Sequence, residues 1–116
     1  MRPDGPPECP FCRIVAGQQA AEIVYRDELL TAFRDIWPQA PTHILIVPNA
    51  HIASLAYIDE KDCPLLGRVF AVINRLAAEE GIGQKGYRVV VNCGTMAGQT
   101  VPHLHFHLLG GRAMRG

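Results

Sequence analysis

The chain has 116 residues, of which 48% are hydrophobic and 19% charged, a balance that predicts one domain with a buried core. Eleven basic and eleven acidic residues cancel, so no basic surplus indicates general nucleic-acid binding. The N-terminal residues lack the apolar core of a signal peptide, and no apolar run is long enough to span a bilayer. We therefore expect a cytoplasmic protein that binds neither nucleic acid nor a membrane.

The chain opens on a segment without a folding pattern. Residues 1–8 are dominated by proline, glycine and charge, and we expect a disordered tail there. Residues 9–116 then form the single folded domain. Its first predicted element is a short helix over residues 11–16, which Gly17 would end as a C-cap.

Three short apolar segments follow and predict strands. Residues 22–25 and 29–34 are β-branched or aromatic runs on either side of a turn-like stretch, which is the pattern of a hairpin. Pro38 and Pro41 predict a loop, because they deny ladder hydrogen bonds and restrict the residues before them. Residues 43–47 are apolar almost throughout, which is typical of a central strand buried on both faces.

One long amphipathic pattern lies between residues 63 and 80. Its apolar residues recur at helical spacing and are Leu65, Leu66, Val69, Phe70, Ile73, Leu76 and Ala77. Asp62 is the expected N-cap of this helix, and Gly81 the expected stop. Residues 87–92 and 104–109 supply two further strands. The order of elements predicts an α+β fold, a five-stranded antiparallel sheet with one long and one short helix.

Three of the five histidines, His103, His105 and His107, occupy alternate positions. On a strand these imidazoles share one face, while Leu104 and Phe106 point to the other. Neighbours on one face stand about 6.5–7 Å apart, too far to bond directly but suited to surround one ligand. An exposed polar face is a weaker explanation, because Thr, Lys or Glu would serve there.

Two chemistries fit this alternation. His-x-His on a strand can supply ligands to a catalytic zinc, completed by a further side chain and a water. Alternatively, the imidazoles work without metal, one as a nucleophile and its neighbours as hydrogen-bond donors to phosphate. Residues 92–102, directly upstream, are rich in glycine, small hydroxyls and amides that suit an anion, which favours the phosphate interpretation.

The four cysteines divide into a pair and two isolated residues. Cys9 and Cys12 have the Cys-x-x-Cys spacing of metal or redox sites, since a disulfide framework is not expected in a reducing cytosol. Cys63 and Cys93 are expected to be small buried apolar residues.

The segment from His103 to Leu109 resembles the signature of the histidine triad (HIT) superfamily, in which three histidines alternate with apolar residues and two apolar residues follow. Flanking segments from about Cys9 to Met114 resemble its nucleotide-binding protein branch. These segments are residues 33–36, 38–43, Pro48 with His51, 86–88, Asn92, Gly98 with Gln99, and 110–112. The resemblance implies a HIT domain over residues 9–116.

This resemblance implies a hydrolase that cleaves a P–N or P–O bond to a purine nucleotide such as AMP or GMP. His105 would attack phosphorus and carry a transient nucleotidyl group, and His107 would donate to a phosphate oxygen. His43 corresponds to a fourth histidine of the family site, and Thr100 to a hydroxyl near the leaving group. Imidazole suits the attack, because much of it is neutral and nucleophilic near pH 7.

The same resemblance implies the nucleotide pocket. Asp35 would accept hydrogen bonds from both ribose hydroxyls, while Asn92 and Gln99 would supply amides near the phosphate. The base would lie among apolar residues, namely Phe11, Ile14, Phe33, Ile36 and Leu45. Two positions depart from the family pattern, since Gln19 replaces an apolar residue often near the base and Trp37 replaces a small one.

A metal and a partner subunit are also implied. Cys9, Cys12, His51 and His103 would hold a zinc ion, and a set of two cysteines and two histidines is closed and therefore structural. No catalytic metal is expected. The long helix and the strand beside it would join two chains in a homodimer with a ten-stranded sheet.

Three functions remain open at this point. The first is hydrolysis of nucleoside phosphoramidates or related adenylated compounds through a nucleotidyl-histidine. The second is hydrolysis of dinucleoside polyphosphates, although the long polar tract that often accompanies that branch is not evident in the sequence. The third is a nucleotide-responsive binding module, which would engage partners through the helix of residues 65–77.

Overall fold

A computed structural model describes residues 5–116. Of the predicted tail, residues 1–4 lie outside the described residues, and residues 5–8 lead through a turn in which the Pro6 carbonyl accepts from the Cys9 N–H (3.0 Å). The helices and strands are α1 (Pro10–Val15), β1 (Ile23–Arg26), β2 (Leu30–Arg34), β3 (Thr42–Pro48), α2 (Cys63–Glu79), β4 (Tyr87–Val90) and β5 (Phe106–Gly110). No helix within residues 5–116 is long and apolar enough to cross a membrane.

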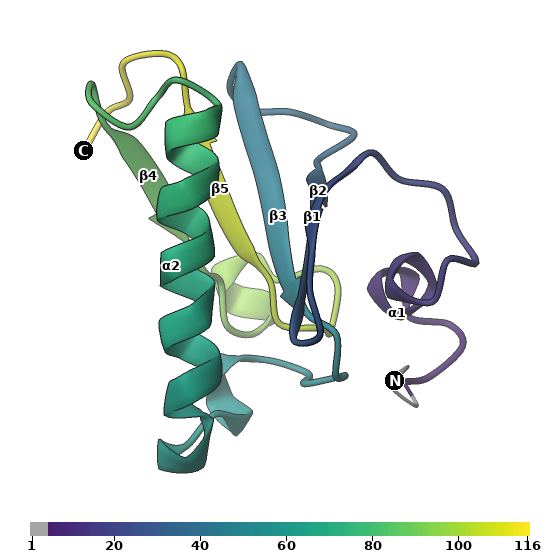
Figure 1. The fold of residues 1–116 in the computed structure, drawn as a ribbon. Helices are drawn as coiled ribbons and strands as arrows, with labels where there is room; N and C mark the ends of the chain where they lie inside the picture. Colours follow the sequence, from purple (N-terminus) through teal and green to yellow (C-terminus); the bar gives the residue numbers. More distant parts are fainter. Residues whose placement is uncertain (1–4) are drawn as a thin grey trace.

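The strands form one antiparallel sheet in the order β1-β2-β3-β5-β4. The central pairing sets Leu45 of β3 opposite His107 of β5, and His107 in turn opposite Val90 of β4. Figure 1 shows α2 lying along one face of this sheet and α1 on the opposite side. The α+β class predicted from the sequence is confirmed.

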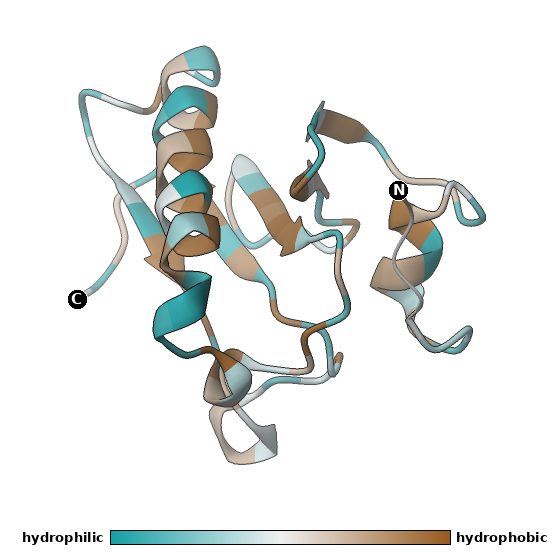
Figure 2. Cartoon of the chain, turned by 60° about the horizontal axis from the view of Figure 1, so that its bottom comes forward, coloured by the Kyte–Doolittle hydropathy of each residue, from teal (hydrophilic) through white to brown (hydrophobic). Residues whose placement is uncertain are grey.

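Strand β3 is buried along its whole length because each of its faces has its own helix layer. Ile44 and Ile46 pack in the core cluster with α2, whereas Leu45 and Val47 pack in a second cluster with α1. Hydrophobic residues accordingly dominate the middle of β3, while they alternate with hydrophilic ones along α2 (Figure 2). The expected central strand, buried on both faces, is confirmed.

Helix α2 buries one face and ends as the sequence predicts. Its buried residues recur at helical spacing and are Val69, Val72, Ile73, Leu76 and Ala77. The helix stops before Gly81, whose φ of +76° is the left-handed conformation that favours glycine. Asp62 directly precedes α2, but its carboxylate accepts from the Asp59 N–H (3.1 Å) and caps the preceding 3-10 turn. Asp62 is thus the N-cap residue of α2, as predicted, but its side chain makes no cap hydrogen bond to that helix.

Strand β5 begins at Phe106, two residues later than expected. The Leu104 N–H donates to the Ile52 carbonyl (2.7 Å), so the chain before β5 pairs with a loop and not with the sheet. His103 lies in a bend and His105 just ahead of the strand. The alternation nevertheless persists, because Leu104 and Phe106 pack in the core cluster with α2.

The two isolated cysteines, Cys63 and Cys93, are exposed, so the expectation of burial is wrong. Cys63 is the first residue of α2, and the buried stripe of that helix begins only at Val69. Cys93 follows the end of β4, where the chain leaves the ladder.

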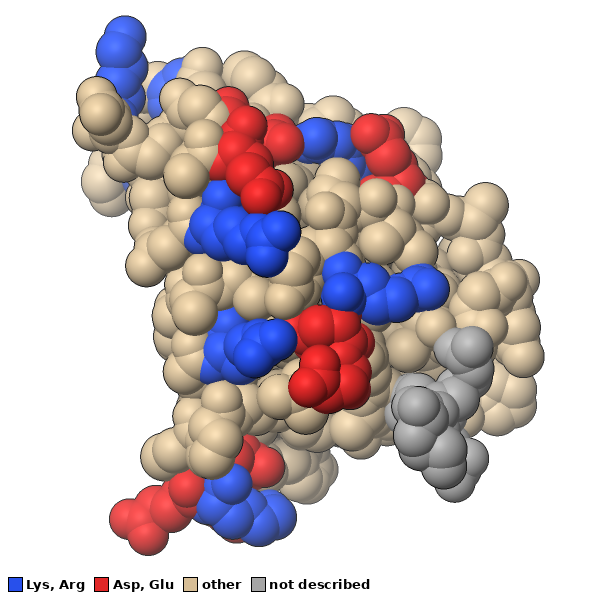
Figure 3. All heavy atoms as spheres, viewed as in Figure 1, with Lys and Arg blue, Asp and Glu red and all other residues tan. Residues whose placement is uncertain are grey.

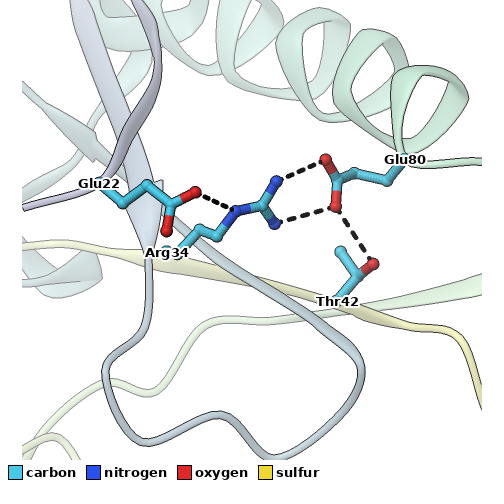
Figure 4. A network of polar contacts seen from close by, with 4 residues as sticks. All are labelled: Glu22, Arg34, Thr42 and Glu80. Atoms are coloured by element: carbon cyan, nitrogen blue, oxygen red, sulfur yellow. Dashed lines mark hydrogen bonds and ion pairs between the residues drawn. The ribbon is translucent and has the colours of Figure 1, made fainter.

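A charged network ties α2 to the sheet. Arg34 of β2 donates through both terminal nitrogens to the Glu80 carboxylate (2.9 and 2.8 Å) and through Nε to Glu22 (3.1 Å), as Figure 4 shows. Thr42 of β3 donates to the same Glu80 (3.3 Å). On the face shown in Figure 3 basic and acidic side chains are interspersed, so this face presents no broad field of one sign.

Candidate active site

A cavity of about 470 Å³ opens on the α1 side of the sheet. Ten residues predicted to be catalytic or nucleotide-binding line it, namely Phe11, Ile14, Phe33, Asp35, Ile36, His43, Leu45, Thr100, His105 and His107. They come from α1, β2, β3, β5 and the loops between them, segments far apart in the sequence. The cavity thus joins an apolar wall to a group of histidines, the combination expected of a ligand site.

His105 has its tautomer fixed by the backbone. Its Nδ1 lies 2.7 Å from the His103 carbonyl oxygen, and because a carbonyl only accepts, Nδ1 carries the proton. The lone pair therefore resides on Nε2. The side chain is buried, and the ring of Phe11 meets it edge-on with centroids 5.1 Å apart. This imidazole is held in the form that a nucleophile requires.

His107 has the opposite tautomer, set through His43. The Gln39 N–H donates to Nδ1 of His43 (3.0 Å), and because a backbone N–H only donates, the proton of His43 is on Nε2. That Nε2 lies 2.9 Å from Nδ1 of His107. His107 therefore accepts at Nδ1 and carries its own proton on Nε2. A donor N–H at His107 and a lone pair at His105 stand side by side, with ring centroids 5.1 Å apart.

Burial favours the neutral forms of His43 and His107. Burial, followed by the neighbouring His105 and His43, lowers the pKa of His107 to about 4. Burial also lowers the pKa of His43, although the nearby Asp35 carboxylate opposes that shift. Neutral rings satisfy the donor and acceptor assignments above, which protonated rings would not.

Asp35 lies beside this pair, and its carboxylate has two partners. Oδ1 accepts from the Trp37 N–H (2.8 Å), and Oδ2 lies 3.4 Å from Nε2 of His43. Asp35, His43 and His107 come close enough to hold a cation between them. However, Nε2 of His43 carries a proton, and a protonated nitrogen does not ligate a metal. The three residues are better described as a hydrogen-bond chain than as a metal site.

Two predicted nucleotide-binding residues, Asn92 and Gln99, do not line the cavity. The Gln99 side chain is buried, and its amide groups bond to its own loop and to the segment after β3. Its Oε1 accepts from the Gly94 N–H (2.8 Å), and its Nε2 donates to the carbonyls of Ala53 (2.8 Å) and Val101 (3.0 Å). In this conformation Gln99 shapes the loop before β5, from which Thr100 reaches the cavity.

The second predicted cluster, of two cysteines and two histidines, assembles next to the first. Nδ1 of His103 lies 3.3 Å from Sγ of Cys9, 3.5 Å from Sγ of Cys12 and 3.2 Å from Nδ1 of His51. Sγ of Cys12 lies 3.2 Å from Nδ1 of His51. These four soft or borderline ligand atoms all lie within 4.8 Å of one another. They can therefore occupy the corners of a small tetrahedron, the arrangement that zinc prefers.

The surroundings of this cluster also suit a metal. Nε2 of His103 donates to the Pro48 carbonyl (2.9 Å), which leaves Nδ1 with a lone pair toward the cluster. The Cys12 N–H donates to Sγ of Cys9 (3.3 Å). Burial and the adjacent Cys9 sulfur raise the pKa of Cys12 to about 12, and burial lowers the pKa of His103 to about 4. A cation among these atoms would offset the cost of a buried thiolate.

Sequence reasoning missed several residues of the cavity wall. Gln39 contributes a backbone N–H, a group that no residue type reveals in a sequence. Trp37 and Gln19, noted above only as departures from the family pattern, both line the cavity. Trp37 could have been found because it directly follows the predicted pocket residue Ile36. For Gln19 the signal was the family resemblance, which sets this position near the base.

Comparison with known proteins places this geometry in a family. A family model of the HIT domain matches residues 16–114. The chain is 46% identical over 104 residues to a purine nucleoside phosphoramidase of Escherichia coli K12, covering 90% of this chain and 87% of the relative. A HIT family hydrolase from Legionella pneumophila has a similar crystal structure, with a TM-score of 0.91, 45% identity, and coverage of 93% of this chain and 96% of the other.

A histidine triad protein from Clostridium difficile is equally similar in fold, with a TM-score of 0.93 and 41% identity over 97% of both chains. The chain belongs to the HIT domain family. The resemblance inferred from the histidine alternation is therefore confirmed, and the relatives are enzymes, as the sequence predicted.

Proposed function

We propose that the protein is a purine nucleoside phosphoramidate hydrolase in which His105 is the nucleophile. The observation that carries this proposal is the pair of opposite tautomers at His105 and His107, with a lone pair next to an N–H donor in one cavity. A phosphorus centre needs both groups, an attacking atom and a donor to its oxygens. The Escherichia coli relative, a purine nucleoside phosphoramidase, supports the substrate class.

The reaction proceeds in two steps. Nε2 of His105 forms a bond to phosphorus while the P–N bond breaks, and the leaving amine takes a proton from solvent, which the attacking water of the second step returns. The positive charge that develops on His105 is stabilised by its Nδ1–H bond to the His103 carbonyl. His107 donates to a non-bridging phosphate oxygen, and the Thr100 hydroxyl lies near the leaving group. Water then attacks phosphorus, which releases the nucleoside monophosphate and restores the neutral imidazole.

The nucleotide is held at the other side of the cavity. Asp35 accepts hydrogen bonds from the ribose hydroxyls. These hydroxyls either join or replace the present partners of its carboxylate, the Trp37 N–H and His43. The base lies against the apolar wall of Phe11, Ile14, Phe33, Ile36 and Leu45. These apolar side chains do not distinguish one purine from another, while Gln19, which also lines the cavity, adds an amide, and we propose purine nucleotides such as AMP and GMP as ligands.

We propose that Cys9, Cys12, His51 and His103 hold a structural zinc ion. When bound, the metal would supply a cross-link among α1, the loop after β3 and the bend before β5. All four ligands are protein side chains, so the set leaves no open position for a substrate. The chain's own contribution is to place Phe11, between the two cysteines in sequence, against His105.

We further propose that the protein acts as a cytoplasmic homodimer. Its cysteines are all free thiols, as suits a reducing compartment. β4 is an edge strand with one paired side, and α2 beside it leaves Phe70 half exposed at 48%. An isologous pairing of these elements would join two sheets and cover this surface.

A substrate panel tests the proposed function. Wild type should hydrolyse adenosine phosphoramidates much faster than diadenosine tetraphosphate. His105→Asn should fold and bind AMP but turn over neither. Preference for the polyphosphate would assign the second family activity instead, and AMP binding without turnover of either compound would identify a binding module.

A further inference from the structure

The segment that follows β5 packs against the loop between β2 and β3. Gly111 has a φ of +96°, and a Cβ at this position would lie 2.9 Å from Cβ of Pro41, so only glycine permits the close approach. Directly after it, Arg112 donates to the Gln39 carbonyl through Nη2 (2.8 Å) and Nε (3.3 Å). Two neighbouring residues thus hold the same loop.

Gln39 is the residue through which this contact reaches the histidines. Its carbonyl accepts from Arg112, and its N–H donates to Nδ1 of His43 (3.0 Å). The N–H lies in the Pro38–Gln39 peptide and the carbonyl in the Gln39–Ala40 peptide, two planes that meet at the Cα of Gln39. A bond that holds one plane therefore restricts the backbone torsions that place the other. Nε2 of His43 faces Nδ1 of His107 at 2.9 Å. Hydrogen bonds on either side of the Gln39 backbone therefore connect Arg112 with His43 and His107.

We propose that Arg112 is a positioning residue, which restricts the backbone torsions of Gln39 and thereby fixes the tautomers of His43 and His107. The inference rests on the proposed function and assigns a role to the Gly-Gly-Arg segment, which that function leaves unused. Without the Arg112 bonds, the Gln39 N–H is free to turn away from His43. His43 can then move its proton to Nδ1 and expose a lone pair at Nε2. His107 would in response donate from Nδ1 and turn a lone pair toward the phosphate oxygen.

The replacement of a donor by a lone pair raises the free energy of the transition state more than that of the ground state, because the phosphate oxygens gain charge during the attack. The base pocket lies elsewhere in the cavity and keeps its contacts. Arg112→Ala should therefore lower kcat roughly 10-fold or more, as is usual for residues that orient a functional histidine, with little change in KM. Arg112→Lys should restore part of kcat, since one ammonium replaces the two-pronged guanidinium.

Arg115→Ala is the matched control. It removes the same charge from the same terminal segment, while its side chain has no contact with Gln39. Its kcat should stay within twofold of wild type. Adding Arg112→Ala to His43→Ala should cost far less than Arg112→Ala alone, because the two residues act through one another. The Tm of each single arginine variant should equal that of wild type, since the exposed Arg112 is not needed for folding.

Nitrogen NMR of ¹⁵N-labelled histidines gives a readout independent of turnover, since long-range ¹⁵N–¹H couplings distinguish the two tautomers. Wild type should show protons on Nε2 of both His43 and His107, and Arg112→Ala should show a mixture. Unchanged tautomers with unchanged kcat in Arg112→Ala, or equal losses in Arg112→Ala and Arg115→Ala, would overturn the inference. If wild type fails to hydrolyse phosphoramidates, the proposed function fails, and the tautomers alone still decide the role of Arg112.

Discussion

His107 owes its donor role to its neighbours and to burial. The Gln39 N–H fixes the tautomer of His43, and His43 fixes the tautomer of His107. The proton on Nε2 of His107 is therefore determined through two successive hydrogen bonds. Burial and the adjacent histidines lower its pKa from the ordinary 6.5 to about 4, which keeps the ring neutral near pH 7. This neutrality has a consequence for stability.

We predict that wild type loses stability between pH 6.5 and pH 4 partly through His107. In this window the unfolded imidazole binds a proton and the folded one does not, so the free energy of unfolding decreases as the pH falls. His107→Asn removes this group and should show a shallower fall of Tm over the same window. Parallel pH profiles for the two proteins would contradict the assignment of a neutral His107.

Trp37 offers a direct probe of the cavity. It is the only tryptophan of the chain, its side chain lines the cavity, and it is 77% exposed. We predict that AMP shifts its fluorescence to shorter wavelengths in a saturable way, because the ligand excludes water from the indole. Asp35→Asn should raise the AMP concentration needed about 10-fold, since a neutral amide accepts more weakly from the ribose hydroxyls. AMP binding by calorimetry without any change in emission would show that Trp37 faces away from the ligand.

At the level of elements, α1 is placed by its apolar packing on β2 and β3 and carries the two cysteines of the proposed metal site. The helix has only six residues, too few for stability on its own, and both Cys9 and Cys12 belong to it or cap it. Phe11 from the same turn packs on Phe33 (centroids 5.4 Å apart) and on His105. A metal at the cluster would therefore hold one wall of the cavity.

We predict about one equivalent of zinc per chain in the purified protein. Cys12→Ser should remove it and lower Tm by several degrees, while kcat falls less, because the metal ties α1 to the sheet and takes no part in the attack. Cys63→Ser is the control, since this exposed thiol has no place in the cluster and should change neither zinc content nor Tm. Zinc-free protein with unchanged Tm would argue against the structural role.

The sequence predicted elements best where one periodicity dominated. α2 and the doubly buried β3 followed directly from their apolar patterns. The start of β5 did not, because Leu104 is as buried as a strand residue yet bonds to Ile52 outside the sheet. The N–H of Asp59 likewise competed for the carboxylate of Asp62. Burial patterns reveal which side chains face the core, but they do not reveal the partners of backbone groups.

The same limit applies to the site. The cavity-lining histidines and apolar residues could be named from the histidine alternation and the family resemblance. The roles of Gln39 and Arg112 could not, because they act through a backbone N–H and a carbonyl. Nor could the sequence show that the amide groups of Gln99 bond to its own loop and to the segment after β3. Residue types predicted the chemistry, and the hydrogen-bond geometry determines which atoms carry it.

At the scale of the whole molecule, the exposed part of α2 leads to a prediction about assembly. Phe70 is 48% exposed, and its ring contacts the buried Phe106 edge-on. We predict a dimer at micromolar concentration, which Phe70→Glu should weaken because it would place a charge in the apolar contact. Phe70→Leu, the conservative control, should remain dimeric. A wild-type monomer in sedimentation equilibrium would contradict the proposed pairing.

The most direct test of the account is to trap the nucleotidyl group on His105. Wild type is mixed with adenosine phosphoramidate labelled at phosphorus and quenched within milliseconds in alkaline denaturant, because phosphorus–imidazole bonds are lost in acid. We predict label bound covalently to the peptide that contains His105, at a level that rises and decays with turnover. His105→Asn should show neither label nor turnover, and His107→Asn should form the adduct more slowly, by ~10²–10³ for one lost donor. Full activity in His105→Asn, or turnover without protein-bound label, would contradict the account.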